Sequence, residues 1–147
     1  GPGNARLPLP PMLMFDRITE VSATGGANGK GYMRAEFDIK PSLWFFDCHF
    51  KGNPVMPGVL QVEAMAQIGG ILVMNTVPDP ENYWTIFLGI NEVRFRKMVV
   101  PGDTLVIQCD LLAPIKRGIA KMYGRAFVGN TLVCEGTMTA SIVRKES

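Results

Sequence analysis

The sequence predicts an α+β fold in which one long central helix packs against a curved antiparallel β-sheet. Residues 58–75 are apolar on every side of a 3.6-residue period, which is typical of a helix enclosed by the rest of a protein. Two strand-like segments precede this helix and four follow it, and wrapping one sheet around the helix is the simplest way to bury it. A chain of 147 residues suits one such domain, expected over residues 4–147.

The first part of the chain contains two predicted strands and a long irregular segment. Residues 4–13 are rich in proline and should form an extended lead-in, because proline suits neither a helix interior nor a central strand. Strands are expected at residues 14–23 and 32–39, on either side of the glycine-rich turn 24–31. Residues 41–57 lack a regular period but are dense in large apolar side chains, so they should pack against the domain.

The second part of the chain is dominated by strand patterns. A Pro-Gly pair at residues 57 and 58 marks the start of the helix, since proline tolerates a first helical turn. After the helix, alternating apolar residues are separated by short turns that contain Pro, Gly or Asn. The four strands are expected at residues 84–94, 104–113, 118–128 and 131–143.

Composition and charge limit the classes of partner. The formal net charge of +2 and the 19% of charged residues provide no basic excess that would follow a nucleic-acid backbone, so no nucleic-acid partner is expected. No apolar run reaches the roughly 18 to 20 residues that a membrane-spanning helix needs. With a single histidine and no CxxC pair, we expect no metal site.

The cysteines and the amino terminus also carry information. Three widely spaced cysteines indicate free thiols and a cytoplasmic location more than a disulfide framework. Residues 1–3 are expected to be a remnant of expression cloning, and no signal-peptide pattern is present.

The stretch HFKGNPVMPGVLQVEAMAQ, residues 49–67, carries the candidate chemistry. His49 is the only histidine and is suited to accept a proton. Gly58 begins the helix, where free backbone N–H groups and the helix dipole stabilise a carbonyl oxygen that gains negative charge. Glu63 is expected to be buried on that helix and to act as an acid, with Gln67 one turn further on the same stripe. A base, an acid and a polarised carbonyl together suit the elimination of water from a 3-hydroxyacyl compound.

Other interpretations of these residues remain open at this point. His49 and Glu63 are also compatible with purely structural roles, and a Pro-Gly pair often only starts a helix. A thioesterase would use the same helix start with a carboxylate that activates water, and a noncatalytic acyl-binding subunit would bind without turnover. Cys48 adjoins His49, but neighbouring residues of an extended segment point to opposite sides, so Cys48 is interpreted as a packing residue.

The same stretch resembles the active-site segment of the 3-hydroxyacyl-[acyl-carrier-protein] dehydratases of type II fatty acid synthesis, which have the hotdog fold. The resemblance extends from LPPMLMFDRITEV through LWFFDCHF to RFRKMVVPGDTL. It implies conversion of (3R)-hydroxyacyl-acyl carrier protein to the trans-2-enoyl product, without a metal or organic cofactor. It also implies a homodimer, or a trimer of dimers, in which opposite protomers contribute the catalytic His49 and Glu63. The Gly58 N–H would polarise the thioester, the Val55 carbonyl would orient the imidazole, and Gln67 would support the acid.

The resemblance also bears on isomerase activity and on docking. Val59 stands where the dehydratase/isomerase branch generally has cysteine, and Glu63 where it has aspartate, so we expect no movement of the new double bond. Acyl carrier protein is acidic, which makes exposed cations candidates for docking. The candidates are Arg94, Arg96, Lys97, Lys116, Arg117 and Lys121, with Lys116 and Arg117 preferred.

Overall fold

The computed structural model describes residues 8–145, so the predicted cloning remnant at residues 1–3 lies outside the described residues. One long helix is present within this range, α1 (Gly58–Met74), and its bounds agree with the predicted helix. Two short 3-10 helices, η1 (Trp44–Asp47) and η2 (Pro80–Asn82), lie in the connections. The strands are β1 (Arg17–Ser22), β2 (Tyr32–Asp38), β3 (Tyr83–Phe95), β4 (Thr104–Leu111), β5 (Ile119–Val128) and β6 (Thr131–Arg144).

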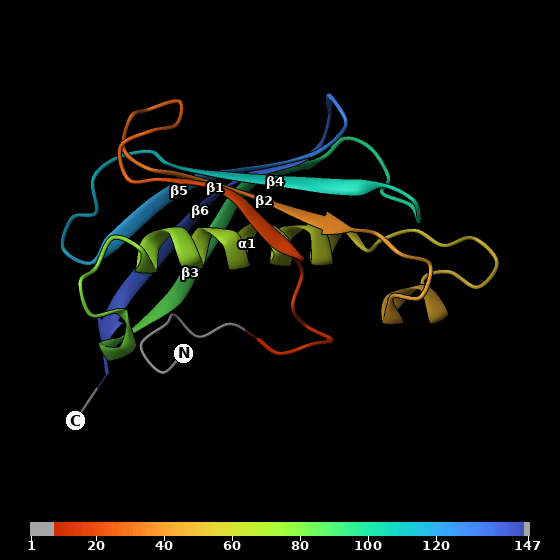
Figure 1. Cartoon of the computed structure of the whole chain (residues 1–147), viewed down its shortest axis with the longest axis horizontal. Coiled ribbons are helices and arrows are strands. Elements are labelled where there is room, and N and C mark those ends of the chain that lie inside the picture. The colour runs from red at the N-terminus through yellow and green to blue at the C-terminus, as the bar shows by residue number, and fades with distance from the viewer. Residues whose placement is uncertain (1–7, 146–147) are drawn as a thin grey trace.

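The six strands form one antiparallel sheet in the order β1-β2-β4-β5-β6-β3. Figure 1 shows the sheet arching over α1, which lies along its inner face. The expected architecture, one central helix wrapped by a curved antiparallel sheet, is therefore confirmed. The two edge strands are β1 and β3, and β3 is the first strand after α1 in the chain.

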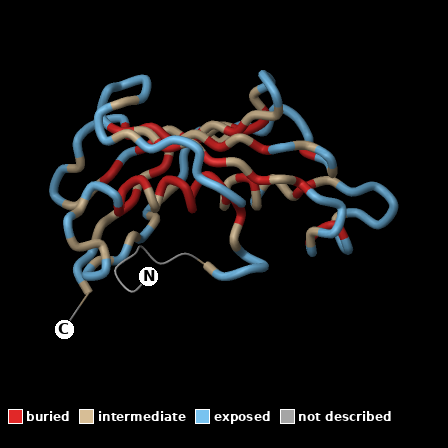
Figure 2. Tube along the Cα trace, in the orientation of Figure 1, coloured by how far each residue is buried: buried red, intermediate tan, exposed pale blue. Residues whose placement is uncertain are grey.

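The core lies between α1 and the inner face of the sheet, where Figure 2 shows most of the buried residues. Ala64, Met65 and Ile68 of α1 are fully buried there, opposite sheet residues such as Ile107 and Met122. Alternation along the strands directs these apolar side chains inward, and burying them supplies the main stabilisation of the fold. The packing of these side chains thus holds the helix against the sheet.

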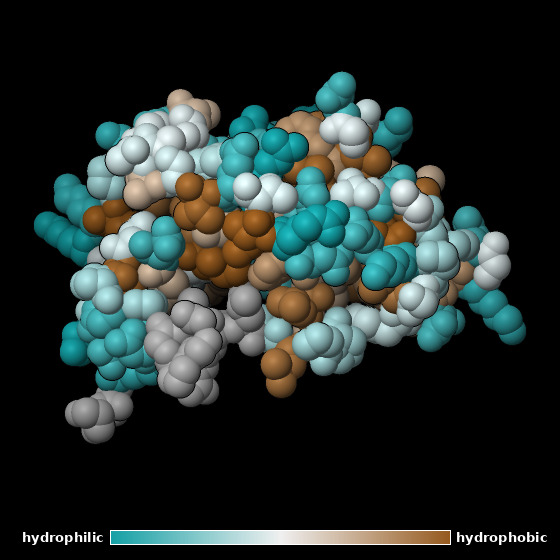
Figure 3. All heavy atoms as spheres, in the orientation of Figure 1, coloured by the Kyte–Doolittle hydropathy of each residue, from teal (hydrophilic) through white to brown (hydrophobic). Residues whose placement is uncertain are grey.

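The side of α1 turned away from the sheet is less buried than the sequence predicts. Val59 is 73% exposed, and Glu63, Gly70 and Ile71 are half-buried. Figure 3 shows apolar side chains gathered over the middle of the molecule, where α1 lies in Figure 1. A single sheet covers only one side of a helix, so the apolar residues on the other side remain partly accessible in one chain.

Two segments before the helix differ from the prediction. The first strand begins at Arg17 instead of residue 14, because the backbone N–H of Met14 donates to the side chain of Gln67 on α1 and not to a neighbouring strand. The irregular segment before the helix contains η1, whose Phe45 and Phe46 are buried. The segment packs against the domain only in part, because Trp44 and Phe50 are 41% and 52% exposed.

The edge strand β3 exposes a row of large apolar side chains. Ile86, Leu88 and Ile90 alternate along it and are 47%, 59% and 38% exposed. A strand of 13 residues with apolar side chains, and with one edge that no described residue pairs, is a ready template for another strand. Among residues 8–145, no helix has the length and apolar character that crossing a membrane requires.

Candidate active site

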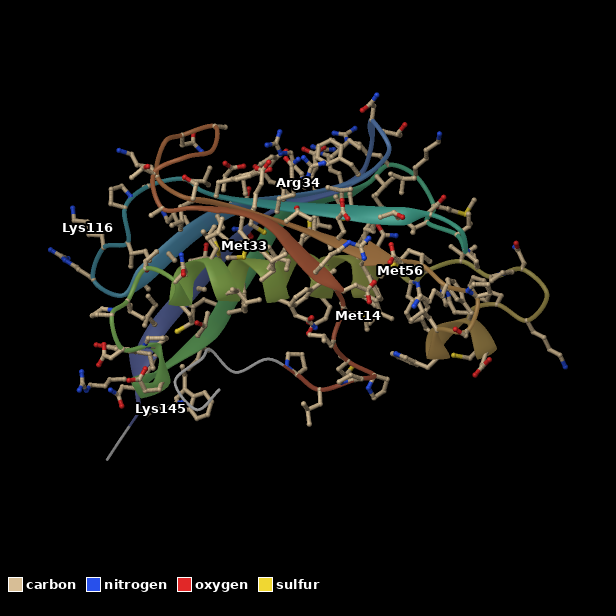
Figure 4. All side chains as sticks on the ribbon, in the orientation of Figure 1. Met14, Met33, Arg34, Met56, Lys116 and Lys145 are labelled. Atoms are coloured by element: carbon tan, nitrogen blue, oxygen red, sulfur yellow. The ribbon has the colours of Figure 1, made fainter. Side chains whose placement is uncertain are left out.

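His49 opens onto a cavity formed by the irregular segment before α1, the first turn of α1 and the end of β3. Figure 4 shows the labelled Met56, one of its lining residues, where that irregular segment meets the rest of the domain. The cavity has a volume of about 540 Å³. It is lined by His49, Val55, Met56, Gly58, Val59, Gln61, Phe95, Arg96, Lys97 and Met98.

The imidazole of His49 is held by its own loop. Its Nδ1 lies 2.8 Å from the carbonyl oxygen of Val55, the contact that the resemblance implies. The backbone N–H of Val55 also donates to the carbonyl of His49, and the ring stacks on Phe50 with centroids 4.0 Å apart. When Nδ1–H donates to the Val55 carbonyl, Nε2 carries the free lone pair. This arrangement leaves Nε2 available to accept a proton.

Gly58 is the first residue of α1 and stands beside the same cavity. Backbone N–H groups at the start of a helix have no intrahelical acceptor, so they remain available to a ligand oxygen. A Cβ atom at this position would lie 2.8 Å from Cε1 of Phe95. Any larger residue at position 58 would therefore require the Phe95 ring to move away from the helix start.

Glu63 and Gln67 form a second group, further along α1. Nε2 of Gln67 donates to Oε1 of Glu63 at 3.0 Å and to the carbonyl of Met12 at 2.8 Å. Oε1 of Gln67 accepts the backbone N–H of Met14 at 2.8 Å. Glu63 was expected to be buried, but it is only half-buried in the single chain, because it lines a cleft of about 210 Å³ between α1 and β3. The other lining residues include Ala66, Gly70, Ile71, Met74, Trp84 and Phe87.

The structure does not bring His49 and Glu63 together within one chain. The His49 cavity and the Glu63 cleft share no lining residue. Gly58 and Glu63 are five residues apart on α1, which places them about 140° apart around the helix axis. One chain therefore presents two half-sites: His49, Val55 and Gly58 on one side of the helix, and Glu63 with Gln67 on the other.

The six candidate docking cations fall into two separate groups. Arg96 and Lys97 line the His49 cavity, just after Arg94 at the end of β3. Lys116, Arg117 and Lys121 line a different cavity at the turn between β4 and β5. Figure 4 shows Lys116 at the left end of the molecule and Met56 well apart from it, to the right of the centre. The cations consequently do not form one continuous patch.

Arg96 is part of a small polar network on the outer face of the sheet. Its Nε lies 2.6 Å from a carboxylate oxygen of Glu135, and the hydroxyl of Tyr123 donates to the other oxygen. The Tyr123 hydrogen bond and then the Arg96 hydrogen bond lower the pKa of Glu135, because both stabilise its charged form. The hydrogen bond between Tyr123 and Glu135 also raises the pKa of Tyr123. Glu135 thus remains an anion that fixes Arg96 at the cavity rim.

The cysteine beside His49 takes no part in this cavity. Cys48 is exposed, which corrects the interpretation that it packs inside, and its thiol is directed to the carbonyl of Phe45 at 3.5 Å. It is also absent from the residues that line the His49 cavity.

Within the described range, no group of three or more His, Cys, Asp or Glu side chains is placed to hold a metal ion.

A comparison with protein-family models assigns the chain to a family. The model of the FabA-like domain matches residues 7–137. The chain belongs to the FabA-like domain family. Two relatives, the bifunctional enzymes LpxC/FabZ of Porphyromonas gingivalis and Bacteroides thetaiotaomicron, are each 48% identical over 136 residues, which is 92% of this chain. The chain spans 28% of the length of each of these relatives.

Solved structures share the architecture of this FabA-like domain. A dehydratase heterocomplex from Xenorhabdus doucetiae matches with a TM-score of 0.71 and 18% identity, over 95% of this chain and 87% of that chain. A hypothetical thioesterase with coenzyme A from Streptococcus pneumoniae matches with a TM-score of 0.64 and 17% identity, over 91% of this chain and 94% of that chain. At such identities the likeness shows the fold alone, and it confirms the expected hotdog fold.

Sequence reasoning did not single out two residues that shape the cavity of this FabA-like domain. Phe95 ends β3 and packs against Gly58, yet in the sequence it lies just beyond the predicted strand 84–94. Gln61 lines the cavity from α1 and is 3% exposed. The available signal for Gln61 was an amide on a mostly apolar helix, a signal that Gln67 shares.

Proposed function

We propose that the chain, as a homodimer, removes water from (3R)-3-hydroxyacyl-acyl carrier protein to give trans-2-enoyl-acyl carrier protein. The observation that carries this proposal is the pairing of the oriented His49 imidazole with the open helix start at Gly58 in one cavity. Relatives 48% identical over most of the chain carry FabZ in their name and support the same conclusion. Fatty acid biosynthesis is the pathway that this reaction serves.

The proposed reaction divides the proton transfers between two side chains. Nε2 of His49 takes the proton on C2, and the electron pair moves through an enolate whose oxygen accepts the Gly58 N–H. The C2–C3 double bond then forms as the C3–O bond breaks, and the partner's Glu63 gives its proton to the departing hydroxyl group, which leaves as water. A proton passing from His49 back to Glu63 restores both groups. Proton transfer of this kind requires no metal or organic cofactor.

The dimer completes each site from two chains. The unpaired edge of β3, with exposed Ile86, Leu88 and Ile90, suits a second copy of the same strand, which would extend the sheet across both protomers. Pairing there brings two α1 helices close, so that the partner's Glu63 meets His49. A trimer of dimers is the higher assembly we propose, and light scattering distinguishes its mass from that of the dimer.

The Glu63 cleft suits the acyl chain. Its walls between α1 and β3 are mostly apolar, and Ala66 and Gly70 leave room beside the helix.

The three thiols of Cys48, Cys109 and Cys134 are free, which supports a reducing compartment, and we place the reaction in the cytoplasm.

Incubation with hydroxyacyl-acyl carrier proteins of graded chain length tests the proposed activity. We expect the ultraviolet absorbance of an enoyl thioester to appear, with the trans-2 isomer as the only product, because Val59 supplies no reactive group beside the substrate. Release of free thiol would instead identify a thioesterase. Binding without turnover would identify a noncatalytic subunit, and a cis-3 product would identify isomerase activity. The thioesterase alternative is not favoured, because the likeness to a thioesterase structure extends to the fold alone.

Docking of the acidic carrier is proposed at the cations beside the His49 cavity. Arg94, Arg96 and Lys97 lie there, whereas Lys116, Arg117 and Lys121 surround a separate cavity, so the first group is preferred over the sequence-based choice of Lys116 and Arg117. Both Lys97 and Lys116 are exposed, which makes them a matched pair of test positions.

Charge reversal at these two lysines should have different effects. We expect Lys97→Glu to raise KM for carrier-linked substrate by roughly three- to tenfold, because it places repulsion at the docking rim. The KM for an acyl thioester of a small thiol, which lacks the carrier protein, should stay unchanged. Lys116→Glu should leave the KM of both substrates unchanged. A larger effect from Lys116→Glu would move the docking surface to the turn between β4 and β5.

A further inference from the structure

Gln61 is a buried polar residue whose side-chain carbonyl lacks a partner. It is 3% exposed, and within residues 8–145 its Oε1 accepts no hydrogen bond. Gln67, the other buried glutamine of α1, has both ends of its carboxamide bonded to Met12, Met14 and Glu63. The protein therefore supplies hydrogen-bond partners to both ends of the Gln67 carboxamide but none to the Gln61 carbonyl.

A free carbonyl at such a position is costly. Buried polar groups in proteins are nearly always hydrogen-bonded, and a missing bond destabilises the folded state. Gln61 lines the His49 cavity together with Gly58. A half-turn of its carboxamide exchanges the carbonyl and the NH₂ group, so either can face that cavity. The cost is accounted for if a ligand in the cavity supplies the missing bond.

The position of Gln61 relative to Gly58 indicates which ligand group it meets. The two residues are three positions apart on α1, which corresponds to a rise of about 4.5 Å and a rotation of about 60° around the axis. In a 3-hydroxyacyl thioester, the carbonyl oxygen and the 3-hydroxyl oxygen are separated by three carbon atoms, with bonds of about 1.5 Å. A substrate whose carbonyl oxygen accepts the Gly58 N–H thus brings its hydroxyl group within one helical turn, near Gln61.

We propose that the carboxamide of Gln61 hydrogen-bonds the 3-hydroxyl group of the substrate and determines specificity for hydroxyacyl over saturated acyl thioesters. This inference rests on the proposed dehydratase function and deepens it. A hydroxyl group both donates and accepts, and so does a carboxamide. The other polar side chains of the cavity besides His49 are the cations Arg96 and Lys97, which are exposed and suit the anionic carrier instead.

The test measures binding in a background that cannot turn the substrate over. In a Glu63→Gln protein, calorimetry compares a 3-hydroxyacyl thioester with the saturated acyl thioester of the same length, with and without Gln61→Met. We expect Gln61→Met to weaken binding of the hydroxyacyl ligand about tenfold, the effect of one hydrogen bond, and to leave the saturated ligand unchanged. Equal weakening of both ligands, or of neither, overturns the proposal.

Thermal unfolding separates recognition from a structural role. Methionine has nearly the length of glutamine and no polar end, so Gln61→Met should keep or raise Tm if the carboxamide has no partner in the protein. A fall in Tm together with equal loss of both ligands assigns Gln61 to the fold and overturns the proposal. Dehydration by the wild-type chain is measured separately. Failure of that assay would contradict the proposed function, whereas preserved dehydration without a Gln61 effect would contradict only this inference.

Discussion

Replacing His49 with alanine should lower the rate of dehydration by a factor on the order of 10³, within the range that a positioned general base supplies. The expectation follows from the 2.8 Å contact between Nδ1 and the Val55 carbonyl, which leaves Nε2 free to take the C2 proton. No other histidine exists in the chain to replace it. Enoyl absorbance measured on the purified His49→Ala protein reports the rate directly.

Cys48→Ala is the matched control for this change. Cys48 adjoins His49 in sequence, is exposed, and does not line the cavity, so its loss should leave the rate unchanged. Affinity for a saturated acyl thioester should also survive in His49→Ala, which shows that the cavity remains intact. A His49→Ala protein with the full wild-type rate would mean that the base lies elsewhere, and the proposed mechanism would be wrong.

Mixed dimers of His49→Ala and Glu63→Gln protomers should recover activity that neither variant has alone. The two half-sites lie on different sides of α1, so each complete site is proposed to combine His49 of one protomer with the partner's Glu63. A mixed dimer then contains one intact site and one doubly defective site. We expect about half of the wild-type rate per mixed dimer, because a two-fold symmetric dimer has two equivalent sites.

Subunit exchange provides the control for the mixing experiment. The two variants are unfolded and refolded together, or are mixed without exchange, and the rates are compared. Recovery should require exchange and should follow the fraction of mixed dimers, measured with protomers that carry different affinity tags. If verified mixed dimers stay at the background rate, His49 and Glu63 do not act across the interface.

Much of the fold could be predicted because local patterns and long-range packing agree. The Pro-Gly pair and the apolar run determine α1, and regular alternation marks the second-half strands to within two residues of their observed ends. The start of β1 could not be predicted, since it depends on Gln67, which takes the backbone N–H of Met14 away from a strand pairing. A contact between residues 53 positions apart leaves no local signal.

The candidate site shows the same division. His49, Gly58 and Glu63 stand out in sequence because each residue type suits one step of the chemistry, and the structure shows how the fold distributes them between two cavities. The separation of the six cations depends on which ends of β3 and β5 they occupy, and charge alone does not reveal this. The isolation of Gln61 is likewise invisible in sequence, because a hydrogen bond that is not formed depends on every neighbour of the side chain.

The three hydrogen bonds of Gln67 have a consequence for how the chain is trimmed. Two of them bind the backbone of Met12, in the proline-rich lead-in, and of Met14, which directly follows it, and the third holds Glu63. The lead-in therefore fixes the rotamer of Gln67, and Gln67 passes that constraint to the carboxylate. A truncated version that starts at Phe15 would retain every residue of the two cavities from His49 onward, yet its acid would lose the anchor that sets its direction.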